Sequence, residues 1–256
     1  MPEQAAQIHS RCLAIIPAYN EEALVYQTVL AARKISEVDA VIVIDDGSQD
    51  ETAARARAAG AVVIRRPKQR GKGAAIEAAA KSILEELDDS GNPLILLLDA
   101  DLGSTATEAA RLIEAVRGRR ADMAIGMLPR RPDTSAGGFG FVVGLSSWGI
   151  HRCTGWKATQ PLSGQRCLTL ESLKSARPLA RGFGLETAMT IDLLRKGFRV
   201  LEVETNLAHR VTGKDWSSQI HRGRQFRDVL LALMPRLLKR LRDSNKSPKS
   251  RNASPK

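Results

Sequence analysis

Two carboxylates at the end of an apolar run are the side chains best suited to chemistry in this sequence. Asp99 and Asp101, one residue apart, follow the run 93–98, which is rich in Leu and Ile. Such a run is typical of a buried parallel strand, and carboxylate oxygens at its end are hard ligands for a divalent cation. A second run, of Val and Ile, ends in Asp45 and Asp46. Two acidic strand ends in one sheet favour a single cation site that suits a diphosphate. Asp-x-Asp also occurs, however, at the ends of strands that bind no ligand.

A sheet is needed to bring these carboxylates together, and the chain has the pattern of one. Strand-like runs at 12–16, 40–44, 61–64, 94–98, 121–127 and 199–204 alternate with helix-length segments at 22–35, after Asp50, and at 73–87, 107–116 and 185–196. This alternation predicts βαβ units, and therefore an α/β fold with a doubly wound, mostly parallel sheet flanked by helices. We expect Asn20 and Asp50 to cap the first two helices.

After Met127 the alternation stops. Residues 128–159 are rich in Gly and Arg, which favours a mobile loop or lid over the site, or else an irregular surface connection. A C-terminal amphipathic helix is expected at 225–242, and residues 243–256 have the composition of a disordered basic tail. The apolar stripe of this helix consists of Phe226, Val229, Leu230, Leu233, Met234, Leu237, Leu238 and Leu241.

Composition narrows the class of protein. The chain has 256 residues, of which 43% are hydrophobic, which is enough for one large α/β domain. No apolar segment approaches the length that spans a bilayer, and the start lacks a secretion signal, so we expect a cytoplasmic protein. The three cysteines contain no Cys-x-x-Cys pair, which indicates buried or incidental thiols and neither a disulfide framework nor a zinc site.

The net charge of +11 is concentrated near the C-terminal end. From residue 210 onward, thirteen Lys and Arg face three Asp, a net charge of +10. A basic segment can bind nucleic acid in a salt-sensitive way, but with 4% aromatic residues and no recognised module we expect no specific nucleic-acid partner. The apolar stripe, flanked by Arg236, Lys239, Arg240 and Arg242, could instead lie on an anionic membrane, or pack on the sheet or on a second copy in a homodimer.

Two nucleotide-binding signatures are absent. Gly138-Phe139-Gly140 does not lie between the first strand and its helix, so it is not a dinucleotide fingerprint, and residues 71–73 lack the flanking residues of a P-loop. The glycines around Lys72 could still let the backbone approach a phosphate, or form a plain turn into a helix.

Four short motifs occur in order along the first half of the chain. They are Ile-Ile-Pro-Ala-Tyr-Asn-Glu-Glu at 15–22, Ile-Asp-Asp-Gly-Ser-Gln-Asp at 44–50, Gly-Lys-Gly at 71–73 and Asp-Ala-Asp at 99–101. Together they resemble the nucleotide-sugar half of family 2 glycosyltransferases, which have the GT-A fold. Residues 160–165, 182–186 and 209–210 resemble, more loosely, the acceptor half of glucosyl-3-phosphoglycerate synthases and polyprenyl-phosphate sugar transferases. The resemblance implies one domain at 1–242, with a nucleotide-sugar half at 1–127 and an acceptor half at 128–242.

The resemblance also implies roles for single residues. Asp46 would hold the base edge, and Glu21 and Asp99 the ribose. Asp101 would bind Mg²⁺ or Mn²⁺ on the diphosphate, with His209 either a further ligand or an ordinary hydrogen-bonded side chain. The nucleotide sugar would be bound by Pro17, Ala18, Tyr19, Glu21, Asp46, Lys72, Asp99 and Ala100, and the acceptor by Ser163, Gly164, Gln165, Gly184, Arg222 and Arg224.

The resemblance places Glu186 with Asp101 in the catalytic machinery. Glu186 would be the general base for an acceptor hydroxyl, or would only cap its helix. If the acceptor is an ionised phosphate, no base is needed and Glu186 would orient it.

The expected function is a metal-dependent hexosyltransferase that moves a single sugar from a nucleotide sugar, most simply UDP-glucose, to a small or lipid-linked acceptor. The Gln-x-x-Arg-Trp motif and the membrane helices of processive polysaccharide synthases are missing, which favours a single transfer. Two alternatives are transfer to polyprenyl phosphate at the cytoplasmic face of a membrane, and a non-catalytic nucleic-acid binder that uses the basic C-terminal segment.

Overall fold

The computed structural model describes residues 12–86, 92–129, 139–209 and 217–246, with the side chains of the last helix described for 223–242. In these residues the strands are β1 Cys12–Ala18, β2 Ala40–Asp45, β3 Val62–Arg65, β4 Leu94–Leu97, β5 Met123–Met127, β6 Arg166–Thr169 and β7 Val200–Glu204. They form one sheet in the order β3-β2-β1-β4-β6-β5-β7. The pairs β4–β6 and β5–β6 are antiparallel, and the other pairs are parallel.

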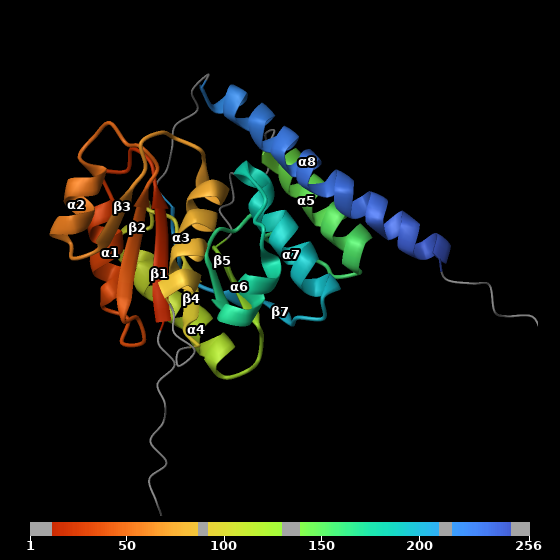
Figure 1. Cartoon of the computed structure of the whole chain (residues 1–256), viewed down its shortest axis with the longest axis horizontal. Helices are drawn as coiled ribbons and strands as arrows, with labels where there is room; N and C mark the ends of the chain where they lie inside the picture. Colours follow the sequence, from red (N-terminus) through yellow and green to blue (C-terminus); the bar gives the residue numbers. More distant parts are fainter. Residues whose placement is uncertain (1–11, 87–91, 130–138, 210–216, 247–256) are drawn as a thin grey trace, which may run out of the picture.

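Helices cover both faces of the sheet (Figure 1). They are α1 Val25–Arg33, α2 Thr52–Ala58, α3 Lys72–Glu86, α4 Ala110–Arg117, α5 Phe139–Thr154, α6 Leu170–Ala176, α7 Leu185–Arg195 and α8 Ser217–Lys246, with the 3₁₀ helices η1 Gly103–Ala109 and η3 Gly182–Gly184. Residues of α1, α2 and α4 share one hydrophobic core, and residues of α3, α6 and α7 share the other. The predicted doubly wound, mostly parallel α/β sheet is therefore confirmed.

The continuous apolar runs in the sequence follow from this double coverage. Successive side chains of a strand point to opposite faces of the sheet, so a strand covered on both faces needs apolar residues at every position. In β4, Leu96 enters one core, while Ile95 and Leu97 enter the other. The strand ends where its acidic residues reach the rim of the sheet.

The start of the first helix differs from the prediction. α1 begins at Val25, not at residue 22, and no side chain caps it. Asn20 instead has φ +54° and joins two loops, since its Oδ1 accepts from the backbone N of Gln49 at 3.0 Å and its own N donates to Ser48 Oγ at 3.0 Å. The cap expected at Asn20 is therefore wrong. Asp50 accepts from the backbone N of Thr52 at 3.0 Å, but the N-cap of α2 is Glu51 and no side chain caps this helix, so the cap expected at Asp50 is also wrong.

The second half contains regular structure that the sequence did not predict. α5 occupies much of the segment expected to be a loop or lid, so that expectation is wrong for 139–154, while residues 130–138 lie outside the described residues. Its glycines lower helix propensity, but Gly149 is needed because a Cβ there would overlap the side chain of Leu233 on α8. The short antiparallel strand β6 and the helix α6 were also not predicted.

The C-terminal helix is confirmed and is longer than expected. α8 extends from Ser217 to Lys246, so it begins before residue 225, and the disordered tail expected from residue 243 is wrong for residues 243–246. Residues 247–256 of the predicted tail lie outside the described residues. Among the described helices, none combines the length and the apolar character that crossing a bilayer would require. The three cysteines are buried and free, as predicted.

Candidate functional site

The loops that follow β1, β2 and β4 meet at the carboxyl edge of the sheet, as predicted for the motifs they carry. The backbone N of Asp46 donates to the carbonyl of Ala18 at 2.9 Å, and the N of Glu21 donates to Thr52 Oγ1 at 2.8 Å. The hydroxyl of Thr28, on α1, donates to the carbonyl of Ala100 at 2.8 Å. These bonds fix the relative positions of the three loops and form one rim on which a ligand could be held.

The carboxylates at the end of β2 are buried and bonded to backbone. Asp45 Oδ1 accepts from the N of Ser48 at 2.9 Å. Asp46, 3% exposed, accepts with its Oδ2 from the N of Arg70 at 2.9 Å and from the N of Gly71 at 2.6 Å. Its Oδ1 lies 3.0 Å from Arg66 Nη1, without the alignment of a hydrogen bond. Asp46 thus holds the turn that leads into α3, and its role at a base edge stays a prediction.

The carboxylates at the end of β4 face other side chains. His209 Nδ1 lies 2.9 Å from Asp101 Oδ1 and donates to it, because an ionised carboxylate only accepts. His209 Nε2 lies 3.8 Å from Asp99 Oδ2. One ligand atom from each of the three residues lies within 4.8 Å of the others. Two carboxylates and an imidazole fit a divalent cation such as Mg²⁺ or Mn²⁺, and the imidazole suits the softer Mn²⁺ better.

Lys72 links this cluster to Glu186. As the first residue of α3, it places its Nζ 2.5 Å from Asp99 Oδ1 and 3.0 Å from Glu186 Oε1, which comes from the first turn of α7. Burial would lower the pKa of Lys72, but attraction to the two carboxylates raises it above its ordinary value. The lysine is therefore a fixed positive charge at the helix N-terminus, where a phosphate is also favoured.

The charges of the cluster depend on one another. Burial would raise the pKa of Asp99, but attraction to Lys72 and His209 holds it below its ordinary value. Burial would lower the pKa of His209, but its hydrogen bond to Asp101 and attraction to both aspartates raise it. Three carboxylates thus surround one ammonium and one imidazole, and this arrangement favours the entry of a further cation.

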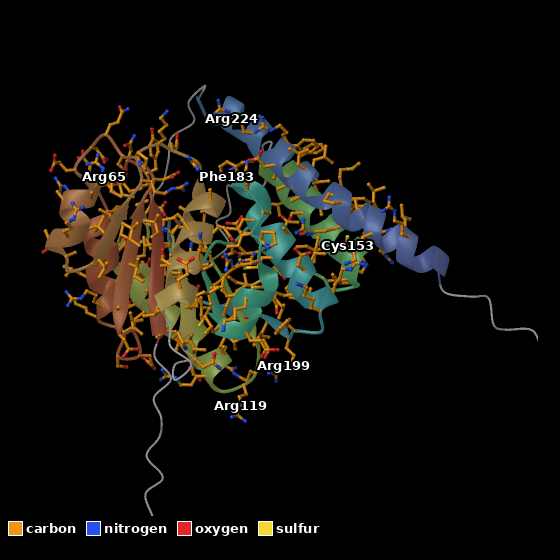
Figure 2. All side chains as sticks on the ribbon, in the orientation of Figure 1. Arg65, Arg119, Cys153, Phe183, Arg199 and Arg224 are labelled. Atoms are coloured by element: carbon orange, nitrogen blue, oxygen red, sulfur yellow. The ribbon has the colours of Figure 1, made fainter. Side chains whose placement is uncertain are left out.

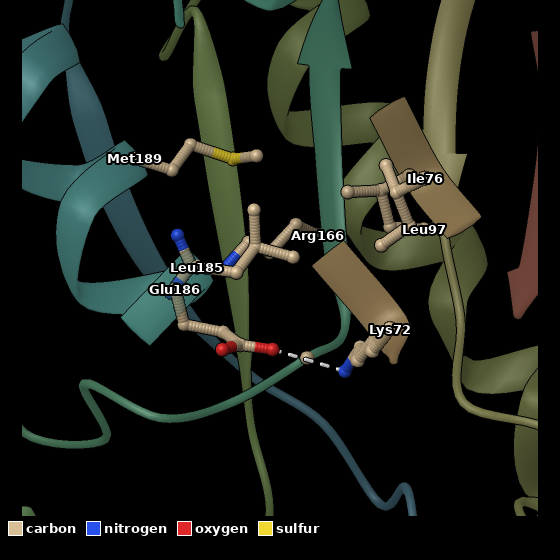
Figure 3. Close-up of a pocket in the computed structure, with 8 residues that line it drawn as sticks. Lys72, Ile76, Leu97, Arg166, Leu185, Glu186 and Met189 are labelled. Carbon is tan, nitrogen blue, oxygen red and sulfur yellow. Dashed lines mark ion pairs between the residues drawn. The ribbon is translucent and has the colours of Figure 1, made fainter. Parts of the chain in front are cut away.

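Lys72 and Glu186 face each other at the edge of a small, mainly apolar pocket (Figure 3). Its other lining residues are Ile76, Leu97, Gly164, Arg166, Leu185 and Met189. An apolar surround strengthens electrostatic interactions, because it offers little solvent to screen them. A Cβ on Gly164 would overlap Lys72 Nζ and lie 2.8 Å from both carboxylate oxygens of Asp99, so only glycine lets the backbone approach the ion pair this closely.

The loop before β6 positions Asp99. Gln165 Nε2 donates to Asp99 Oδ2 at 2.6 Å, and Gln165 Oε1 accepts from the N of Asp99 at 2.9 Å. Ser163 is 8% exposed, and its hydroxyl donates to the carbonyl of Gly126 at 2.6 Å. Both were predicted to contact the acceptor. In this structure Gln165 orients a carboxylate and Ser163 anchors the loop.

Arg166 is a residue that the sequence analysis did not identify. It is 1% exposed and donates to the carbonyls of Ser163 at 3.0 Å and Pro161 at 3.2 Å, and to Thr190 Oγ1 at 3.0 Å. Thr190 in turn donates to the carbonyl of Glu186 at 2.8 Å. Burial lowers the pKa of Arg166 to about 10, against the attraction of Glu186. Arg166 thereby joins the Gln165 loop to the turn that carries Glu186. The available signal was a charged residue directly before the apolar residues Cys167 and Leu168.

The remaining predicted residues lie in different surroundings. Ala18 and Ala100 are buried at the rim, and Tyr19 is 37% exposed beside them. Gly184 is covered by α8, since a Cβ there would meet the carbonyl of Asp228 at 2.5 Å. Arg224 is exposed near the start of α8 (Figure 2). The side chain of Arg222 lies outside the described residues, and Pro17 and Glu21 lie partly buried where β1 ends.

A family model described as Glycosyl transferase family 2 matches residues 13–138. The chain is 30% identical to undecaprenyl-phosphate mannosyltransferase of Micrococcus luteus over 216 residues, which cover 80% of this chain and 86% of that protein. It is 28% identical to glycosyltransferase AglJ of Haloferax volcanii over 209 residues, 78% of this chain and 64% of that protein. It is 30% identical to glucosyl-3-phosphoglycerate synthase of Mycobacterium tuberculosis over 207 residues, 74% of this chain and 62% of that protein. The chain thus spans less than two thirds of the last two relatives.

A solved structure supports the same similarity. The crystal structure of the Mycobacterium tuberculosis glucosyl-3-phosphoglycerate synthase in complex with Mn²⁺, uridine diphosphate and phosphoglyceric acid matches with a TM-score of 0.71 and 25% identity, covering 89% of this chain and 78% of that chain. A complex of the same protein with Mg²⁺ and uridine diphosphate matches with a TM-score of 0.69. The present fold is therefore the fold of that protein.

Proposed function

As a member of glycosyltransferase family 2, this chain is a glycosyltransferase, and we propose that it transfers one sugar from a metal-bound nucleotide sugar, most simply UDP-glucose, to a small or lipid-linked acceptor. The observation that carries the proposal is the gathering of Asp99, Asp101 and His209, with ligand atoms within 4.8 Å, on the rim that also holds Lys72 and Glu186. Support for a uridine donor and for Mn²⁺ or Mg²⁺ comes from the solved complexes of the mycobacterial protein.

The proposed reaction needs the charges of this rim. An acceptor oxygen forms a bond to the anomeric carbon, the bond from that carbon to the diphosphate breaks, and its electron pair leaves with the diphosphate. A divalent cation held by Asp101 and His209, with Asp99 beside them, would neutralise the charge that develops on the leaving group. Lys72 and the N-terminus of α3 add positive charge on the same side.

Glu186 supplies the other half of the proposed reaction. If the acceptor is a hydroxyl, its proton passes to the carboxylate of Glu186 as the new bond forms. If the acceptor is an ionised phosphate, no proton has to move, and Glu186 with the loop at 160–165 positions the acceptor instead. The ion pair with Lys72, at 3.0 Å, keeps the carboxylate facing the cluster in either case.

Thermal stabilisation by nucleotides tests the donor site. Uridine diphosphate with Mn²⁺ is expected to raise the unfolding temperature of the wild type, while either alone has a smaller effect. Asp101→Ala is expected to lose the metal-dependent part, and Glu186→Gln to keep it while losing transfer. An unchanged Mn²⁺-dependent stabilisation in Asp101→Ala would contradict the proposed metal ligand.

Transfer to polyprenyl phosphate is the second candidate. The relative that supports it is the undecaprenyl-phosphate mannosyltransferase, of which the chain covers most of the length. One labelled donor offered with phosphoglyceric acid or with undecaprenyl phosphate distinguishes the two acceptors. Product from phosphoglyceric acid alone would contradict the lipid acceptor, and product from undecaprenyl phosphate alone would contradict the small one.

A further inference from the structure

Within the described part of the chain, α8 presents two apolar faces, of which one packs on the protein and the other is exposed. Val229 and Leu233 are fully buried in a cluster shared with α5 and α7, and Leu237 lies at its edge. On the adjoining face, residues spaced by four lie along one side of the helix and stay exposed. They are Phe226 at 42%, Leu230 at 38%, Met234 at 48% and Leu238 at 50%, with Leu231 at 63% beside them. The stripe predicted from the sequence is therefore divided between the core and the surface.

α5 adds exposed apolar side chains along the same seam. Phe141 is 79% exposed and Trp148 is 53% exposed, and Leu145 between them packs at the edge of the shared cluster. Since Leu145 on α5 and Leu237 on α8 border one cluster, the exposed residues of the two helices flank a common seam. Figure 1 shows α8 lying along α5 on the outside of the molecule. We name this set the α5–α8 surface: Phe141, Trp148, Phe226, Leu230, Leu231, Met234 and Leu238.

The charged side chains around the α5–α8 surface are mainly basic. Residues 223–242 contain six Arg and Lys and one acid, Asp228. The side chain of Asp228 is 17% exposed; its Oδ2 accepts from the N of Phe183 at 3.4 Å, and its Oδ1 accepts from Arg227 Nη2 at 3.0 Å, so Arg227 is paired. Arg224, Lys239 and Arg242 are exposed, and α5 carries Arg152 and no acid. A second copy of this face would bring like charges together, whereas an anionic lipid surface is complementary to both its charge and its apolar character.

We propose that the α5–α8 surface docks on an anionic membrane surface. The apolar side chains would enter the boundary between headgroups and acyl chains, and the Arg and Lys side chains would bind lipid phosphates. The attachment is interfacial and needs no membrane span. α8 also covers η3, the turn that leads directly into Glu186, so docking would bring the candidate catalytic edge near the bilayer. Only this last consequence, a lipid-borne acceptor, rests on the proposed function.

Vesicle flotation with matched variants tests the docking. The 256-residue chain is expected to bind vesicles of phosphatidylcholine with phosphatidylglycerol at least about tenfold better than vesicles of phosphatidylcholine alone. Leu231→Ser with Leu238→Ser is expected to lower this binding by about tenfold. The matched control, Tyr26→Ser with Val62→Ser, removes side chains that are 40% and 59% exposed on other elements and should leave binding unchanged.

Charge is tested in the same way. Lys239→Ser with Arg242→Ser is expected to weaken binding to the anionic vesicles, whereas Lys34→Ser with Arg57→Ser, which removes the same charge from exposed sites on other elements, should not. If both pairs weakened binding equally, net charge alone would explain it and the proposal would be wrong. Equal binding to both kinds of vesicle, or none, would also overturn it.

Two further readouts separate the other occupants. A dimer in sedimentation equilibrium that Leu231→Ser with Leu238→Ser dissociates, without vesicle binding, would assign the surface to a second copy. Transfer RNA binding that competes fully with vesicles and is unaffected by that variant would assign the contact to charge alone. Each variant is compared by its stabilisation with uridine diphosphate and Mn²⁺, which reports folding and the donor site without the membrane. Failure of docking therefore remains distinguishable from failure of the proposed transfer reaction.

Discussion

β2 and β4 both end in paired carboxylates, yet the two pairs have different partners. At the end of β2, Asp46 is buried, and its Oδ2 accepts from backbone N–H groups of the turn into α3. At the end of β4, Asp99 and Asp101 are about a quarter exposed and face the side chains of Lys72 and His209. A backbone donor cannot leave without opening its loop, whereas a side chain can rotate away for a ligand. The carboxylates at the end of β2 therefore stabilise the loops of the site, whereas those at the end of β4 can exchange their side-chain partners for a ligand.

This difference predicts opposite consequences for substitutions at the two ends. At the end of β4, a lost carboxylate should weaken ligand binding and catalysis more than it weakens the fold. At the end of β2, a lost carboxylate should weaken the fold first, because buried backbone N–H groups lose their acceptor.

The largest expected effect is at Asp101. In Asp101→Asn the proposed metal loses a charged ligand, so transfer should fall by about 10³-fold or more, because a Lewis-acid cation contributes several kcal/mol to the transition state. The unfolding free energy of the metal-free protein should change by less than about 1 kcal/mol, since Asp101 is partly exposed. Steady-state kinetics with varied Mn²⁺ and urea unfolding with a chelator measure the two effects. A large loss of stability in Asp101→Asn, together with an unchanged dependence of activity on Mn²⁺, would contradict the proposed difference between the two strand ends.

The second effect concerns Glu186. Glu186→Gln should lower kcat on the order of 10²-fold for a hydroxyl acceptor while leaving the KM of the donor unchanged, because only the proton acceptor is removed. Glu171, exposed in the first turn of α6, is a control for the helix dipole, since Glu186 lies in the first turn of α7 but is also buried and paired with Lys72. If Glu186 has only a structural role, neither substitution should change kcat, and Glu171→Gln should cost about 0.3–1 kcal/mol of stability.

Asp46 tests the opposite end of the comparison. In Asp46→Asn, the N–H groups of Arg70 and Gly71 lose a charged acceptor, so urea unfolding should show a loss of roughly 1.5–3 kcal/mol. Donor affinity should fall only as far as the turn into α3 is disturbed. An unchanged stability together with a strong, base-dependent loss of nucleotide affinity would instead show that Asp46 contacts the base.

How much of the fold and of the candidate site could be predicted from the sequence depends on how far apart in the chain the interacting residues lie. The runs that became β1, β2 and β4 are apolar on both faces, and the acidic residues mark where they end, so the sheet and its rim were predictable. The contact of Lys72 with Glu186 was not, because the strands β4, β5 and β6 and the helices α4, α5 and α6 separate them in the chain. Local periodicity carries no information about such a pair, and the family resemblance had to bring the two residues into one site.

Physical reasons explain why β6, α5 and the burial of Arg166 were not predicted from the sequence. β6 spans only Arg166–Thr169 and begins with a buried charge, which a pattern search takes as a loop. α5 contains glycines that lower helix propensity, and Gly149 is explained only by the close approach of Leu233 from α8. The burial of Arg166 could not be predicted from the sequence either. Its hydrogen-bond acceptors are carbonyls and a hydroxyl, and none of them is an acidic residue nearby in the chain. In each case a tertiary contact determines a residue type that local rules disfavour.

The smallest expected effect is a pH dependence of the unfolding free energy that arises at the end of β4 and not at the end of β2. The hydrogen bond to Asp101 and the nearby carboxylates raise the pKa of His209 above its unfolded value, against the effect of burial. A raised pKa of a base means that its stabilisation is fully present below the unfolded pKa, about 6.5, and is lost as the pH rises through the folded pKa. With a chelator present, the stability difference between wild type and His209→Asn should therefore be larger at about pH 6 than at about pH 8.5, by a few tenths of a kcal/mol after solvent screening.

Asp46→Asn provides the control for this titration, because the hydrogen bonds that Asp46 accepts come from backbone N–H groups. Its stability difference from wild type should be flat between these pH values. Saturating Mn²⁺ should reverse the trend at His209, since a ligating imidazole must be neutral and metal affinity rises with pH. A His209→Asn difference that stays flat with the chelator and with Mn²⁺ would mean that His209 neither titrates with the aspartates nor binds the metal. The partner exchange inferred for the end of β4 would then be limited to Lys72.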